Sequence, residues 1–299
     1  MRLLVIIVTY NAMRWADRCF GSLRTSNIKP DVFVVDNGST DGTQVFLRNN
    51  FPEIIFMQSK ENLGFGKANN LGLQYALDNE YDYVYLLNQD AWIFHDTLEK
   101  LVGVSKKHPE YGILSPFQME ANQEHLDSNF KKKTCRWESS PELLDDLYFH
   151  KNRDVIPVGH VMAAHWLITR DCILKVGGFS PTFPHYGEDN NFEHRAEYNG
   201  FMIGIVPASQ AVHDRENRSV SKKKQIYQKY IDGLIRMSNP RIRPSRAIIV
   251  TLYSALVNIV RLYSVVPVWD FFRIIVHYSQ IRHNRIESIK NECVFLNKH

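Results

Sequence analysis

Polar side chains suited to ligand binding directly follow three apolar segments of the chain. They are Thr9, Tyr10 and Asn11 after the first segment, Asp36 after the second and Asp90 after the third. Each group alone is also typical of a turn, because Asp, Asn and Gly are common turn residues. The carboxyl ends of parallel strands meet at one edge of a sheet, so together these groups favour a ligand crevice there.

The sequence lacks the two common glycine-rich phosphate loops. It has no GxxxxGK[ST] motif, and Gly64-Phe65-Gly66 lacks the third glycine and the preceding strand of a dinucleotide fingerprint. A diphosphate would therefore need another positive partner, and a divalent cation (Mg²⁺ or Mn²⁺) held by a carboxylate is the simplest candidate. Asp90 is suited to hold it, with a helix-capping role as the alternative.

A second acidic pair, Glu188 and Asp189, lies at the start of a helix predicted over residues 189–199. Two acids at this position can simply stabilise the helix dipole. Neighbouring helical side chains point about a third of a turn apart, however, so one acid can face a pocket and accept a proton from a hydroxyl. His213 follows a strand predicted over residues 201–206, and beside a phosphate-bound cation it would be a neutral nitrogen ligand.

Alternating strands and helices position these residues. Apolar, β-branched runs predict buried strands over residues 3–8, 31–35, 54–58 and 83–87. Helical spacing predicts helices over residues 14–26 and 67–79. This alternation is typical of an α/β fold with a doubly wound, mostly parallel sheet and right-handed crossovers.

The chain after residue 100 is less regular. Residues 122–154 are polar and poorly periodic, which predicts an extended or mobile segment over the edge of the sheet. Residues 161–168 resemble a strand, and residues 170–176 resemble a short helix that ends at Gly177-Gly178.

The last part of the chain, residues 219–299, predicts a C-terminal α-helical extension. Its apolar stretch over residues 247–260 is shorter than the roughly 20 residues that span a bilayer. Two alternatives stay open for this helical pair. It packs on the domain or on a second subunit as a homodimer, or it lies on an anionic membrane surface, with Lys222–Lys224 and Arg261 as anchors.

Composition excludes several classes of protein. The 36 basic and 32 acidic side chains give a net charge of only +4, which does not support a nucleic-acid partner. The four cysteines form no CxxC pair, which excludes a zinc ribbon or a dense disulfide framework and favours a reducing cytoplasm. The first residues, MRLLVIIVTYN, run directly into a polar turn and predict a strand instead of a signal peptide.

With these features assembled, the chain resembles a family 2 glycosyltransferase of the GT-A (Rossmann-like) fold, in the bacterial rhamnosyltransferase-like branch. The resemblance extends from Val5 to about His213. It rests on segments that occur in the family's order: IIVTYNA, VVDNGSTDGT, ENLGFGKANNLG, LLNQDA, VGGFSPTFPHYGEDNNFEHR and VHD. It implies a catalytic domain over residues 1–218, with a nucleotide-sugar half (about 1–100) and an acceptor half (about 101–218).

The resemblance also implies roles for individual residues. A nucleotide-diphosphate-sugar donor would be bound by Thr9, Tyr10, Asn11, Asp36, Asn62, Gly64, Asn69, Asn88 and Asp90. Asp90 matches the last acid of the family's DxD-type motif and Asn88 replaces the first, so the cation would rest on Asp90 and His213. Asp189 matches the catalytic base, with Glu188 in support. Ser180 and Asn190-Asn191 depart from the family pattern, which would shift acceptor preference.

The implied activity is an inverting transfer of a sugar to a hydroxyl of a glycan or lipid-linked glycan, in surface polysaccharide biosynthesis. The enzyme would be cytoplasmic, at the inner face of the cell membrane. A nucleotidyltransferase loses support because no glycine follows the first strand. The remaining alternative is a catalytically silent sugar-nucleotide-binding or scaffold protein, and the presence of Asp90, Glu188, Asp189 and His213 favours the enzyme.

Overall fold

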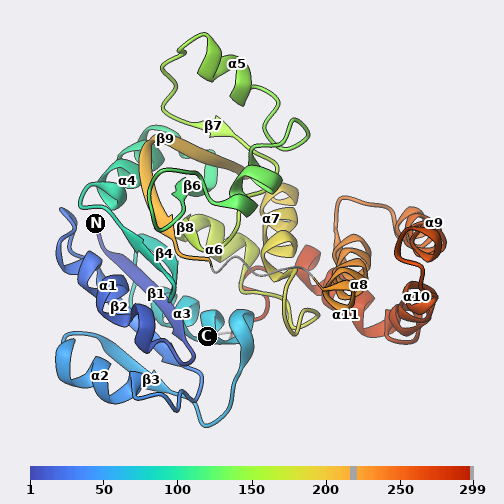
Figure 1. Ribbon diagram of the computed structural model, residues 1–299, viewed down its shortest axis with the longest axis horizontal. Coiled ribbons are helices and arrows are strands. Elements are labelled where there is room, and N and C mark those ends of the chain that lie inside the picture. Colours follow the sequence, from blue (N-terminus) through green and yellow to red (C-terminus); the bar gives the residue numbers. More distant parts are fainter. Residues whose placement is uncertain (216–220, 297–299) are drawn as a thin grey trace.

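The fold is built on one nine-stranded mixed sheet, seen in a computed structural model that describes residues 1–215 and 221–296 (Figure 1). In spatial order its strands are β3 (Ile55–Gln58), β2 (Asp31–Asp36), β1 (Leu3–Thr9), β4 (Tyr83–Asn88), β8 (His165–Thr169), β6 (Tyr111–Met119), β9 (Met202–His213) and β5 (Ala91–Ile93). The short strand β7 (Ile156–Pro157) pairs with β9.

The first four strands in this order are parallel, and their carboxyl ends meet at one edge. Thr9 of β1 is in register with Asp36 of β2, and Val8 is in register with Asn88 of β4. Strand β8 is antiparallel to β4 and β6, whereas β6 and β9 are parallel to each other. The predicted α/β fold with a mostly parallel central sheet is therefore confirmed.

Helices cover both faces of the sheet because each central strand is apolar on both sides. Leu4 and Ile6 of β1 pack with α3 (Gly64–Asp78), α6 (Arg170–Val176) and α7 (Glu188–Tyr198). The alternate residues Leu3, Val5 and Ile7 pack on the opposite face with α1 (Met13–Arg24), α2 (Thr43–Asn50) and α4 (Thr97–Lys107). The two sets alternate because successive side chains of a strand point to opposite faces of the sheet.

For the middle of the chain, one prediction is wrong and another is confirmed only in part. Residues 122–154 are not simply extended: they contain the π-helix η1 (Phe130–Thr134) and the helix α5 (Leu143–Tyr148), anchored by the buried Phe130 and Leu143. The strand predicted over residues 161–168 begins only at His165. The residues before it are buried but do not pair as a strand. An apolar sequence indicates burial, but it does not by itself indicate hydrogen bonding to a neighbouring strand.

Four helices form the C-terminal extension, which projects from one side of the sheet (Figure 1). They are α8 (Lys222–Ser238), α9 (Pro244–Leu262), α10 (Val266–Val276) and α11 (Tyr278–Lys290). They share a small apolar cluster that includes Phe183, which precedes α7. The predicted domain boundary at residues 218 and 219 lies outside the described residues.

After α11 the chain returns to the sheet domain. The backbone N of Cys293 donates to the carbonyl of Leu174 (2.8 Å), and the backbone N of Gly178 donates to the carbonyl of Val294 (2.8 Å). Only glycine fits at position 177, because its φ is +78° and a Cβ there would lie 2.1 Å from the Val294 carbonyl oxygen. The end of the extension is thus held against α6 and the turn that follows it.

Helix α9 is longer than the apolar stretch predicted from the sequence. It comprises 19 residues, since its first turn carries polar side chains and its last turn carries Arg261. By length and composition alone, α9 could cross a membrane. In this structure, 22% of its most apolar stretch of 18 residues is buried.

Candidate active site

Asp36 is the centre of a buried hydrogen-bond network at the carboxyl end of β2. Its Oδ1 accepts hydrogen bonds from the hydroxyls of Thr9 (2.9 Å) and Ser39. Its Oδ2 accepts from the backbone N of Gly38 (3.2 Å) and of Ser39 (3.0 Å), and from the Gln44 amide (2.8 Å). Both Thr9 and Asp36 are fully buried, so protein groups already occupy the carboxylate that the resemblance places in the donor site, where it would bind the base or its ribose.

The exposed side of this edge is formed by Tyr10 and Asn11. Tyr10 is 48% exposed, and its backbone N donates to the side chain of Gln89 (2.7 Å) beyond the end of β4. Asn11 has a φ of +52°, and its Oδ1 accepts a hydrogen bond from the backbone N of Thr40 (2.8 Å). These contacts hold the ends of β1, β2 and β4 together at the switch point of the sheet, where the ligand crevice is predicted.

The loop before α3 closes another side of this edge. The Asn37 side chain accepts from the backbone N of Leu63 (3.3 Å), and Asn62 Oδ1 accepts from the backbone N of Gly64 (2.9 Å). Gly64 has a φ of +76°, and a Cβ there would lie 3.1 Å from the carbonyl oxygen of Pro184, which precedes α7. Asn62 and Gly64 are therefore at the edge.

Asn69 has a different environment from the one predicted. It is 1% exposed, and its Nδ2 donates to the carbonyl of Phe65 within α3 (2.9 Å). Asn88 ends β4 and is half-buried, with its backbone N bonded to the carbonyl of Ala164 (3.1 Å). Asn88 is thus placed at the edge of the sheet, whereas Asn69 packs inside the helix layer.

Asp90 and His213 form a carboxylate–imidazole pair between β4 and the end of β9. Nε2 of His213 lies 3.4 Å from Oδ1 of Asp90, and Nδ1 of His213 accepts a hydrogen bond from Nε of Arg215 (3.3 Å). Burial alone would raise the pKa of Asp90, but the hydrogen bond and charge of His213 outweigh it and lower the pKa. Arg215 is itself held 3.3 Å from the buried carboxylate of Asp127.

A second histidine, His165, is buried next to this pair and contacts the backbone of the residue before His213. The hydroxyl of Tyr85 lies 2.8 Å from Nδ1 of His165, and Nε2 of His165 lies 3.0 Å from the carbonyl oxygen of Val212. Burial and the charge of His213 lower the pKa of His165 to about 3, so its ring is neutral. This neutral ring fixes the backbone immediately before His213.

Asp90 and His213 lie close enough to share the divalent cation implied by the resemblance, because their facing atoms are 3.4 Å apart and adjacent ligands of an octahedral ion with bonds of about 2.1 Å are roughly 3 Å apart. Since Nδ1 of His213 accepts from Arg215, the neutral ring carries its proton on Nε2, facing Asp90. A cation at Nε2 would therefore require this proton to move to Nδ1 and the hydrogen bond from Arg215 to break. Within residues 1–215 and 221–296, no third His, Cys, Asp or Glu completes a metal cluster. Such a cation would therefore need oxygens from a bound diphosphate and from water, as is common for Mg²⁺.

The acidic pair at the start of α7 lies in two different environments. Gly187 precedes the helix in the left-handed conformation, and Asp189 Oδ1 accepts a hydrogen bond from the backbone N of Asn190 (2.8 Å). Glu188 is 7% exposed, and its Oε2 has no hydrogen-bond partner among the described residues. Burial, followed by the charge of Asp189, raises the pKa of Glu188 to about 7. Asp189 is the more accessible of the two acids.

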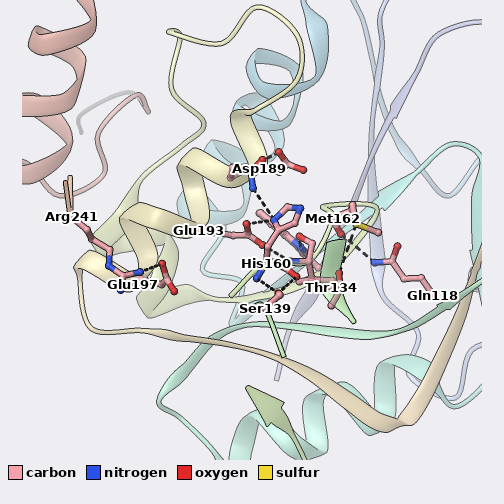
Figure 2. Close-up of polar contacts among 12 residues, drawn as sticks. Gln118, Thr134, Ser139, His160, Met162, Asp189, Glu193, Glu197 and Arg241 are labelled. Carbon is pink, nitrogen blue, oxygen red and sulfur yellow. Dashed lines mark hydrogen bonds and ion pairs between the residues drawn. The ribbon is translucent and has the colours of Figure 1, made fainter. Parts of the chain in front are cut away.

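Two further groups beside Asp189 were missed in the sequence. Nδ1 of His160 lies 2.5 Å from Oε2 of Glu193, one helical turn after Asp189 (Figure 2). Oε1 of Glu193 accepts a hydrogen bond from the backbone N of Val161 (2.8 Å). The i, i+4 spacing of Asp189 and Glu193 was the signal that both acids share one helix face, whereas nothing in the sequence places His160 beside them.

The predicted site residues thus form two clusters. One contains the ends of β1, β2 and β4 together with Asp90 and His213, and the other is the start of α7. The segment that begins α3 contacts both, because Asn37 bonds to Leu63 and a Cβ at Gly66 would lie 3.8 Å from Cβ of Glu188.

The chain is similar to known proteins in sequence and in fold. The model of the family described as "Glycosyl transferase family 2" matches residues 4–171, which is more than half of the chain. An N-acetylglucosaminyl-diphospho-decaprenol L-rhamnosyltransferase of Mycobacterium tuberculosis is 24% identical over 231 residues. That match covers 71% of this chain and 75% of the relative.

Among solved structures, Staphylococcus aureus TarS 1-349 in complex with UDP superposes with a TM-score of 0.59 at 17% identity. The match covers 96% of this chain and 89% of that one. GalNAc-T7 with UDP, GalNAc and Mn²⁺ superposes with a TM-score of 0.58 at 13% identity. It covers 80% of this chain and 50% of that one. At these identities the two structures support the fold alone.

Proposed function

Because the chain belongs to glycosyl transferase family 2, we propose that it moves a sugar from a nucleotide-diphosphate-sugar donor to a hydroxyl of a glycan or lipid-linked glycan, with inversion at the anomeric carbon. The observation that carries the proposal is the arrangement of polar groups at the carboxyl ends of β1, β2 and β4, together with the acidic pair that begins α7. A lipid-linked acceptor is consistent with the name of the mycobacterial relative, an N-acetylglucosaminyl-diphospho-decaprenol L-rhamnosyltransferase.

The donor would lie along the edge formed by Tyr10, Asn11, Asn62, Gly64 and Asn88. Thr9, Asp36 and Asn69 are buried and would not contact the donor directly. Their side chains bond to protein atoms and would hold this edge in shape. In this arrangement Asp36 shapes the turn over residues 36–39 that the nucleotide meets. This role replaces a direct bond from Asp36 to the base.

A single carboxylate suffices for the chemistry. Asp189 accepts the proton of the acceptor hydroxyl, and the resulting nucleophile attacks the anomeric carbon from the face opposite the leaving diphosphate. One displacement inverts the configuration. Glu188, with a pKa raised to about 7 by burial, is partly protonated at neutral pH and adds little negative charge beside the attacking oxygen. Its support of Asp189 is therefore mainly positional.

Asp90 and His213 would hold the divalent cation at the diphosphate. A bound Mg²⁺ or Mn²⁺ supplies positive charge that stabilises the leaving diphosphate more strongly as its own charge develops. The presence of Mn²⁺ in the GalNAc-T7 structure supports a cation in this fold. His165 fixes the backbone before His213, and the His213 ring would release the hydrogen bond from Arg215 when Nε2 binds the cation.

A donor screen tests the proposal directly. We expect a sugar nucleotide of one base, among uridine, deoxythymidine and guanosine diphosphate sugars, to raise the melting temperature by several degrees in the presence of Mg²⁺. At a concentration 100 times its dissociation constant, a ligand stabilises the folded state by about 2.7 kcal/mol. Release of the free nucleoside diphosphate on addition of acceptor would identify an enzyme. Binding without release from any donor and acceptor pair would identify the silent binding protein instead.

The α9–α10 face supports an interaction with the inner surface of the cell membrane. Helix α9 buries small or polar side chains, Ala247, Thr251, Ala255 and Asn258. Large apolar side chains are instead exposed on α9, α10 and their connection: Ile249, Tyr253, Leu256, Val260, Tyr263, Trp269, Phe272 and Val276. This reversal of the usual amphipathic pattern indicates that the outer face meets an apolar environment.

Charge favours lipid over a second copy of the chain as the occupant of this face. Helix α9 carries Arg246 and Arg261 and no acid, and α10 carries Arg273 with one acid, Asp270. A two-fold interface would bring arginines of like charge together, whereas anionic lipid headgroups would neutralise them. Trp269 and the exposed tyrosines are suited to the headgroup region.

We expect Val260→Asp to weaken binding to vesicles of mixed phosphatidylglycerol and phosphatidylcholine by about 10- to 100-fold, because it adds a charge to the face that enters the lipid. Val45→Asp on α2 is the matched control, with a similar exposure (64% against 73% for Val260) and the same change in net charge. Equal sedimentation of both variants would refute the lipid surface. Conversion of a dimer to a monomer by Val260→Asp alone would indicate the homodimer.

A further inference from the structure

Helix α8 lies between the start of α7 and the α9–α10 face (Figure 1). Toward α7, Ile231 packs on Gly187, the residue before Glu188, since a Cβ at Gly187 would lie 2.8 Å from Cγ2 of Ile231. Toward the α9–α10 face, Nζ of Lys222 donates to the carbonyl of Tyr263 (3.3 Å), a residue that is 87% exposed in the connection between α9 and α10. The first part of α8 therefore connects the proposed lipid surface to the start of α7.

One face of α8 carries Lys224, Tyr227 and Ile231, because their spacing is i, i+3 and i+7. The hydroxyl of Tyr227 donates to the carbonyl of His185 (3.1 Å), two residues before Gly187. Burial and then the positive charge of Lys224 lower the pKa of His185, so this lysine is near the same loop. The seven-residue spacing from Ile231 places Lys224 about 10 Å along α8 from the contact with Gly187.

The lysines at the start of α8 form an exposed group of positive charge. Lys222, Lys223 and Lys224 are exposed, and none of them forms an ion pair with an acid that the structure describes. Oγ of Ser221 already accepts a hydrogen bond from the backbone N of Lys224 (3.3 Å), so the helix start is capped and the lysine side chains carry the charge. An anion on this surface would be bound by ammonium groups.

The phosphate of a lipid-linked glycan would meet these lysines. In such a molecule, a phosphate or diphosphate joins the sugar to the lipid. With its hydroxyl beside Asp189 and its lipid under the α9–α10 face, the acceptor would extend along the start of α8, and its phosphate would lie close to Lys224. Lysine binds phosphate oxygens as a compact point charge.

We propose that Lys224 binds the phosphate or diphosphate that joins the acceptor sugar to its lipid, and so selects lipid-linked acceptors over free glycans. The inference rests on the proposed function, since it needs the acceptor hydroxyl beside Asp189. It assigns Lys224 to the substrate and leaves Lys222, which bonds to Tyr263, to the membrane face.

Binding of farnesyl diphosphate tests the site without sugar transfer. The calorimetric titration is made in excess chelator, so that Asp90 and His213 hold no cation for the diphosphate. We expect Lys224→Gln to weaken binding by about tenfold or more, the usual effect of losing a hydrogen bond to a charged group. Lys224→Arg keeps the charge and should retain most of the affinity. Lys106→Gln on α4 is the matched control, because it removes the same charge from another exposed lysine, and its affinity should not change.

A kinetic comparison of two acceptors tests the selection of lipid-linked substrates. The acceptor sugar of the active pair is offered as its dodecyl diphosphate ester and as its dodecyl glycoside. We expect Lys224→Gln to raise KM for the diphosphate ester by about tenfold and to leave KM for the glycoside and for the donor within about twofold. A merely structural role of Lys224 would change both acceptors alike.

Anionic headgroups are the other source of phosphate at this surface. Weaker binding of Lys224→Gln to vesicles of mixed phosphatidylglycerol and phosphatidylcholine, with unchanged affinity for farnesyl diphosphate, would assign Lys224 to headgroups and overturn the inference. An equal rise in KM for both acceptors would also overturn it. In either case the unmodified enzyme still transfers sugar, so the proposed function stands. A chain that transfers no sugar from any donor would overturn the proposed function, and the inference with it.

Discussion

Asp189→Asn is expected to lower turnover by about 10²–10⁴-fold and to leave donor affinity nearly unchanged. The magnitude is the usual contribution of a positioned general base. The amide oxygen of the variant can still accept the hydrogen bond that Asp189 Oδ1 receives from the backbone N of Asn190, so the start of α7 is preserved. Single-turnover rates and calorimetric titration with the donor measure the two quantities separately.

Glu197→Gln is the matched control for this variant. It removes a carboxylate from the same helix, but Glu197 contacts Arg241 of the C-terminal extension and lies away from the start of α7 (Figure 2). We expect its turnover to stay within about twofold of the unmodified enzyme. Weaker donor binding at unchanged turnover in Asp189→Asn would instead show that Asp189 binds the donor and is not the base.

Removal of divalent cations is the second change with a large expected effect. We expect an excess of chelator to abolish sugar transfer and Mg²⁺ or Mn²⁺ to restore it. Asp90→Asn should raise the Mn²⁺ concentration for half-maximal activity by about 100-fold, because an amide oxygen replaces the single carboxylate of the pair. Titration of Mn²⁺ in the presence of the nucleoside diphosphate measures the same loss without turnover.

Asp214→Asn controls for the loss of one negative charge in the same region. Asp214 accepts a hydrogen bond from the indole of Trp15 (3.0 Å), which an amide oxygen can also accept. Its requirement for Mn²⁺ should match that of the unmodified enzyme. Full transfer in excess chelator would remove the cation from the mechanism and reduce Asp90 and His213 to a structural pair.

The first half of the fold could be predicted closely because its strands are buried on both faces. The runs predicted over residues 31–35 and 83–87 end within one residue of β2 and β4. Continuous β-branched sequence has few alternatives to a central strand. In contrast, residues 161–168 are equally apolar, but only residues 165–168 pair as a strand, while residues 161–164 are buried without strand pairing. Composition alone cannot distinguish the two outcomes.

The site could be predicted in part, for a similar reason. The polar residues that follow the strands predicted which end of the sheet carries the site, because neighbouring parallel strands have their carboxyl ends on the same side. They could not indicate that Asp36 turns inward to five donor groups while Tyr10 turns outward. His160 and Glu193 meet across 33 positions of sequence, so their contact depends on how α7 packs against the segment after β7.

The return of the chain to the Gly177 turn has a mechanical consequence for the whole molecule. A lobe that is joined only by one linker can swivel, whereas the backbone hydrogen bonds of Cys293 and Val294 after α11 hold this extension against the sheet domain. With the α9–α10 face resting on lipid, the start of α7 would stand at a constant height above the bilayer. Acceptor hydroxyls at that height would be glycosylated, and those lifted beyond it by further sugar units would pass out of reach.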